Sequence, residues 1–115
     1  MPKLAALTLD STHVKDSDFA YVKSARSLEY LSAGATSLTE EGLALISENP
    51  GIISLWIWRT VIGGESLDSL KKMKNLYYLQ CWNTLIRPEH LRELNDALPD
   101  CNIENHKPDA AYYDQ

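Results

Sequence analysis

The sequence predicts an α/β repeat solenoid with a parallel sheet on its concave face and helices on its convex face. The first observation is a set of residues that recurs every 24 positions. The threonines of this set are Thr12, Thr36, Thr60 and Thr84, and the leucines five residues before them are Leu7, Leu31, Leu55 and Leu79. The second observation is a change of apolar spacing within each unit, from alternate positions typical of a strand to the three-residue spacing typical of a helix. One such unit cannot bury its apolar side alone, so successive units are expected to stack and share a core.

Each unit is expected to open with a short strand, most clearly over residues 52–62. The helical half of the first unit is expected to begin near Asp16, because acidic groups suit the first turn of a helix. In the second unit Thr39 is a suitable N-cap, and Pro50 cannot continue the helix. In the fourth unit Pro88 falls where the first helical residue is expected, and the missing N–H of proline costs nothing there.

The chain divides into one domain and a short tail. Residues 1–105 contain four full repeats and a closing half-repeat, and residues 106–115 form a polar tail. The first strand, over residues 4–9, follows the start of the chain with no capping segment, so its edge is expected to be exposed. That edge is interpreted as a contact for a second copy, as the broken end of a longer solenoid, or as a surface that a partner covers.

The repeated pattern Leu-x-x-Leu-x-Leu-x-x-Thr-x-Val/Ile/Leu, with a helical half after it, resembles the leucine-rich repeat family over residues 4–105. The 24-residue period is most similar to the bacterial Thr-type repeats and is near the ribonuclease-inhibitor branch. The family usually carries Asn or Cys where this chain has Thr. The resemblance implies that this side chain bonds to exposed backbone at the corner after each strand, which a hydroxyl can also do.

Composition narrows the classes of partner. The net charge of −5 argues against non-specific nucleic-acid binding, which requires a basic surface. No apolar run approaches the roughly 20 residues that would cross a bilayer, so no membrane partner is expected. The two cysteines, Cys81 and Cys101, are too few for a disulfide framework, and a reducing cytoplasm is the expected location.

The strand residues between the leucine columns are expected to point away from the core, because side chains alternate along a strand. All three tryptophans lie in these outward columns. Large aromatic residues and arginine dominate the binding energy of protein interfaces. The candidate partner-binding residues are Tyr30, Trp56, Trp58, Arg59, Tyr78, Gln80, Trp82 and Glu104, with Arg59, Gln80 and Glu104 at the rim.

These residues leave several functions open. The first is a protein-binding module, such as an inhibitor or immunity-type protein, that fills a cleft of its partner with aromatic anchors. The second is a scaffold piece that self-associates, and the third is a carbohydrate-binding surface. The tryptophans could also reflect only the preference of aromatic residues for strands, or the tail could cover them with Tyr112 and Tyr113.

Catalysis is not expected, and neither is a cofactor. The three histidines, His13, His90 and His106, are not at metal-ligand spacing. The pair Gly63-Gly64 lacks the pattern and the lysine of a phosphate-binding loop, so it is interpreted as a turn.

Overall fold

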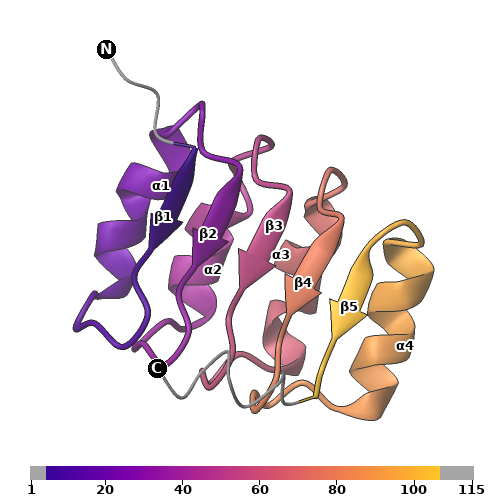
Figure 1. Ribbon diagram of the computed structural model, residues 1–115. Coiled ribbons are helices and arrows are strands. Elements are labelled where there is room, and N and C mark those ends of the chain that lie inside the picture. Colours follow the sequence, from indigo (N-terminus) through magenta and orange to yellow (C-terminus); the bar gives the residue numbers. More distant parts are fainter. Residues whose placement is uncertain (1–4, 107–115) are drawn as a thin grey trace.

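The computed structural model describes residues 5–106 and has one five-stranded parallel sheet in the order β1-β2-β3-β4-β5. The strands are short: β1 Ala6–Thr8, β2 Tyr30–Ser32, β3 Ser54–Trp56, β4 Tyr78–Gln80 and β5 Asn102–Glu104. The helices are α1 Ala20–Ser24, α2 Glu40–Ile46, α3 Leu67–Lys72 and α4 Pro88–Ala97, with 3-10 turns η1 Asp16–Phe19 and η2 Gly64–Ser66 before α1 and α3. All four helices lie on one face of the sheet (Figure 1). The α/β class and the parallel sheet are therefore confirmed.

The strand register follows the repeat period. In the pairing of neighbouring strands, Leu7 lies opposite Leu31, Leu31 opposite Leu55, Leu55 opposite Leu79, and Leu79 opposite Ile103. The strand expected over residues 52–62 is shorter in the structure, since β3 ends at Trp56. Backbone bonding to the next unit nevertheless continues to the corner, where the Arg59 N–H donates to the Trp82 carbonyl at 2.8 Å.

The repeated threonines form the corner that follows each strand. Each hydroxyl donates to the backbone carbonyl three residues earlier, at distances of 2.6–2.9 Å for Thr12, Thr36, Thr60 and Thr84. The expected bond from this side chain to corner backbone is therefore confirmed. The residue before each threonine has a positive φ: Ser11 59°, Ala35 53°, Arg59 53° and Asn83 58°. None is glycine, and only Asn83 is of a residue type that favours the left-handed region, so the sequence gives no consistent signal of this position.

The core lies between the sheet and the helices. Leu31, Leu55 and Leu79 have 0 % exposure and pack with helix residues such as Leu43 and Leu70. The equivalent residue of β1, Leu7, is only partly buried, because within the described chain β1 pairs on one side alone. The predicted tail lies outside the described residues except for His106, as do Tyr112 and Tyr113.

A polar side chain that was expected to cap its own helix instead makes a hydrogen bond between neighbouring units. Thr39 occupies the N-cap position of α2, but its side chain makes no bond to its own helix. Its hydroxyl and its N–H instead bond to the Asp16 carboxylate of the preceding unit, so Asp16 links two helical halves. Asn49 acts similarly, since its buried side-chain amide donates to the Val22 and Ala25 carbonyls at 2.7 and 3.0 Å. Pro88 does open α4, as predicted.

Candidate functional site

The open face, meaning the face of the sheet that no helix covers in Figure 1, carries a row of three aromatic rings across β2, β3 and β4. The Trp56 ring lies between the Tyr30 ring at 6.0 Å and the Tyr78 ring at 5.1 Å, measured between centroids, with interplanar angles near 47° and 46°. We call these three residues the aromatic strip. Ser54 lies in register between the two tyrosines, and its small side chain leaves room for the indole. The Trp56 Nε1–H donates to the Ser54 hydroxyl at 3.1 Å, which fixes the ring.

A second aromatic group lies where the strands end. The Arg59 guanidinium carbon is 5.9 Å from the centroid of Trp58 and 5.7 Å from that of Trp82. Both distances are within the range in which a cation is attracted to a ring face. The Arg59 side chain is exposed, and its backbone has the left-handed φ of 53° described above. This corner therefore holds an arginine stacked by two indoles at the edge of the open face.

Trp58 does not stand out from the sheet as expected. Its exposure is 8 %, because its ring lies flat over Gly34 of the neighbouring unit. A Cβ added to Gly34 would come within 2.1 Å of the ring. The expectation that this side chain is open to solvent is therefore wrong. The alternation of side chains correctly predicted the side of the sheet on which Trp58 lies. Because Gly34 has no side chain, the Trp58 ring can pack directly on the backbone there.

Gln80 is also buried rather than at the rim, with 0 % exposure. Its side-chain carbonyl accepts the Trp82 backbone N–H at 2.9 Å, and its amide is 3.5 Å from the Tyr78 hydroxyl. That hydroxyl in turn donates to the Glu104 carboxylate at 3.0 Å. Gln80 thus connects the aromatic strip to the tryptophan at the corner, and only Glu104 and Arg59 remain as rim residues.

Asp10 is a polar residue of this face that the sequence analysis did not select. Its Oδ1 accepts the Ser32 hydroxyl and the Gly34 N–H, both at 2.7 Å. These bonds hold the end of β1 to the backbone on which Trp58 lies. Its place in an outward column beside Gly34 was the available signal, because a carboxylate there can reach backbone that no side chain covers.

The site offers little for metal or nucleophilic chemistry. Across residues 5–106 there is no group of three His, Cys, Asp or Glu residues that could hold a metal ion. Cys81 and Cys101 are free and buried. Burial raises the pKa of the Cys81 thiol to about 12 and that of Cys101 to about 11, so both stay protonated near neutral pH. His90 accepts the Arg87 N–H through Nδ1 at 3.0 Å, so its imidazole bonds to backbone at the start of α4.

No helix in the described part of the chain is both long and apolar enough to span a membrane.

Comparison with known proteins gives a structural likeness only. No family model and no curated protein matches the sequence. Among solved structures the chain is similar to one described as "Leiomodin-1 Actin-Binding Site 2 (ABS2)", with a TM-score of 0.72 and 13 % sequence identity. The match covers 96 % of this chain and 75 % of that one. At this identity the likeness establishes a shared fold and nothing about the ligand.

Proposed function

We propose that the chain is a leucine-rich repeat solenoid of the Thr type that binds another protein across the open face of its sheet. The observation that carries this proposal is the aromatic strip, three rings in mutual contact on three adjacent strands of the face without helices. The 24-residue register and the threonine corners support the repeat family. Two free, buried thiols suit a reducing cytoplasm.

The strip has the character of an interface core. Tyr30, Trp56 and Tyr78 are all partly exposed, so each ring is held by its neighbours and still reaches solvent. Side chains that are already fixed lose little entropy when a partner binds, and tyrosine and tryptophan are enriched among the residues that dominate binding energy. Binding, rather than catalysis, is the use that such a surface favours.

The charged residues at the rim would orient the partner. Glu104 is fixed by Tyr78, and Arg59 is held between two indoles. A guanidinium is a planar fork of N–H donors, and contact with the two indoles restricts the directions in which Arg59 presents this fork to a carboxylate of the partner. An inhibitor or immunity-type protein, which blocks a cleft of its target, is the form of binding that we favour. The structural neighbour, described as an actin-binding site, is an instance of this fold in a protein that binds another protein, and it indicates no particular partner for this chain.

The test compares Trp56→Ala with Tyr21→Ala. Tyr21 is 82 % exposed on α1, so its replacement removes an exposed aromatic ring from the helix side. Proteins captured from the native host by the wild-type chain would be purified and mixed with each variant. We expect a one-to-one complex with the wild type and with Tyr21→Ala. Trp56→Ala should weaken it by at least about tenfold, as a hot-spot truncation does. Equal affinity for all three chains would refute the proposal.

The alternatives predict other outcomes of the same comparison. Light scattering of the purified chain would show a dimer that Trp56→Ala converts to a monomer if the strip serves self-association. A dimer that survives this change would instead point to the edge of β1, where Leu7 is only partly buried. Carbohydrate binding would shift tryptophan fluorescence on addition of a purified oligosaccharide, without any protein partner.

A further inference from the structure

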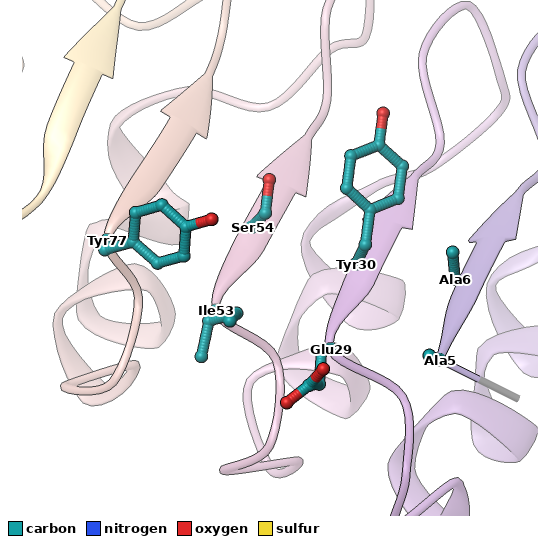
Figure 2. A pocket seen from close by; sticks show the side chains of 7 residues that line it. All are labelled: Ala5, Ala6, Glu29, Tyr30, Ile53, Ser54 and Tyr77. Carbon is teal, nitrogen blue, oxygen red and sulfur yellow. The ribbon is translucent and has the colours of Figure 1, made fainter. Parts of the chain in front are cut away.

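A hollow of about 430 Å³ lies on the open face where the strands begin. Seven residues line it, contributed by four successive units: Ala5, Ala6, Glu29, Tyr30, Ile53, Ser54 and Tyr77. The Tyr30 and Tyr77 rings stand on either side of Ser54, and Ile53 and Glu29 lie at the starts of their strands (Figure 2). The hollow shares Tyr30 with the aromatic strip, so the two surfaces are continuous.

Glu29 is the only carboxylate of this lining, and its side chain is exposed. Its backbone is fixed, because its N–H donates to the Ala5 carbonyl at 2.9 Å and its carbonyl accepts the Ile53 N–H at 2.8 Å. The ion pairs found within residues 5–106 join Lys23 to Glu48, Lys71 to Glu93, and Arg87 to Glu89, and leave Glu29 unpaired there. The hollow therefore combines apolar walls with one negative charge that is open to solvent and is not engaged in an ion pair within residues 5–106.

We infer that this hollow receives one basic side chain, arginine or lysine, from the protein that binds the open face. The inference rests on the proposed function, since it names the chemistry of that partner. Both basic side chains have an apolar stem, which fits against Ile53 and the tyrosine rings. The charged head then meets the Glu29 carboxylate in a charge-assisted hydrogen bond and can face a tyrosine ring.

Other occupants fit less well. An acidic side chain would be repelled by Glu29. A wholly apolar one would bury the carboxylate without a partner, at a considerable cost in free energy. The net charge of the chain, −5, adds a long-range attraction for a basic partner. The volume exceeds what one side chain needs, and this suits a hollow that also admits backbone of the partner on either side.

The test is a titration of the isotope-labelled full chain followed by two-dimensional NMR. The probes are N-acetyl-arginine amide, N-acetyl-lysine amide and the neutral N-acetyl-norleucine amide. We expect saturable shifts at the backbone amides of Glu29, Ser54 and Tyr77 with the two basic probes, and weaker binding of the norleucine compound. Glu29→Gln should weaken binding of the basic probes about threefold to fivefold, in the range of an exposed ion pair.

Glu41→Gln is the matched control. Glu41 is exposed in the first turn of α2, on the helix side, and the substitution removes the same charge from the whole molecule. This variant should bind the basic probes like the wild type. The inference is overturned if the lining amides do not shift, if norleucine amide binds as tightly, or if Glu29→Gln binds unchanged. The titration uses no partner, so it can fail while a Trp56-dependent complex stands, and the reverse also holds.

Discussion

The inward and outward columns of the same strands differ in how strictly the repeat is kept. Facing the helices, the middle of β2, β3 and β4 is leucine each time, at 0 % exposure. Facing the other way, the residues directly after them are Ser32, Trp56 and Gln80 in the same register. Backbone geometry is shared by both columns, so it cannot cause the difference. In the core, packing against the helices restricts the side chain at this position to one size and shape in each unit. On the open face no helix packs against the side chains, so their sizes can differ from unit to unit.

The outward residues nevertheless do not behave as independent surface residues. Ser54 is small where Trp56 needs space, and Gly34 has no side chain where Trp58 lies flat. Gln80 is fully buried, and its side-chain amide bonds to the Trp82 backbone and the Tyr78 hydroxyl. The open face has therefore acquired a packing of its own, built from unlike residues in neighbouring units, on a scaffold of identical ones.

The largest expected effect comes from breaking the inward column. Leu55→Ala removes a fully buried side chain and leaves a cavity between sheet and helices, so we expect a loss of about 3 kcal/mol in the free energy of unfolding. Trp56→Ala, one residue later, removes more atoms from a partly exposed site and should cost about 1–2 kcal/mol. Urea unfolding followed by far-ultraviolet circular dichroism measures both, because the midpoint and slope of the transition can be fitted for each variant from its own folded and unfolded baselines.

If Trp56→Ala proved the more destabilising of the two, the open face would be a structural layer and not a binding surface. An unchanged dependence of the unfolding free energy on urea concentration in both variants is the control. It shows that neither substitution alters how much surface unfolding exposes.

Much of the fold could be predicted because the core repeats. The leucine and threonine columns place five strands in register, and Pro88 marks the start of α4. The start of η1 at Asp16 and the N-cap position of Thr39 were also predicted correctly. The hydrogen bonds at these positions were not, because the Asp16 carboxylate bonds to Thr39 of the next unit. The left-handed corner residues left no consistent mark in the sequence either. Backbone hydrogen bonds to Trp58 and Trp82 of the next units hold a conformation that Ala35 and Arg59 do not favour by themselves.

For the side chains of the candidate site, the sequence predicted the face of the sheet on which they lie but not how far each is exposed to solvent. Alternation along the strands correctly placed Trp56 with Tyr30 and Tyr78. It could not show that Trp58 lies on Gly34 or that Gln80 is enclosed, because burial on an uncovered sheet depends on the sizes of residues in the neighbouring units. The hollow beside Glu29 was missed as well. It combines two neighbouring columns of the repeat, and the column that contains Glu29 lies just before the strands, where alternation gives no side-chain direction.

A second prediction tests the packing of the open face. Gly34→Ala would place a methyl group 2.1 Å from the Trp58 ring, so the ring must leave the backbone of the turn that follows β2. We expect a loss of about 2 kcal/mol in unfolding free energy, typical of an overpacked site. The emission of tryptophan should also move to longer wavelength as the indole becomes exposed.

The double variant Gly34→Ala, Trp58→Ala separates this contact from any direct effect on the strand. Once the ring is absent, the added methyl group has no clash, and Gly34→Ala should then change stability by less than about 0.5 kcal/mol. A full loss in the double variant would mean that residue 34 needs glycine for its backbone and not for the ring that covers it.

The smallest expected effect concerns the corner that joins the two kinds of column, and it has the opposite sign. Ala35 has a φ of 53°, which an L-residue with a Cβ adopts only against steric strain. Ala35→Gly should therefore stabilise the chain by roughly 0.5–1 kcal/mol in urea unfolding, despite the greater freedom of glycine in the unfolded state. The matched control is Ala44→Gly on the exposed side of α2, where the same change should cost about 1 kcal/mol. If both variants lost stability equally, Ala35 would carry no backbone strain at the corner. The hydrogen bonds around the corner would then not be needed to offset such strain.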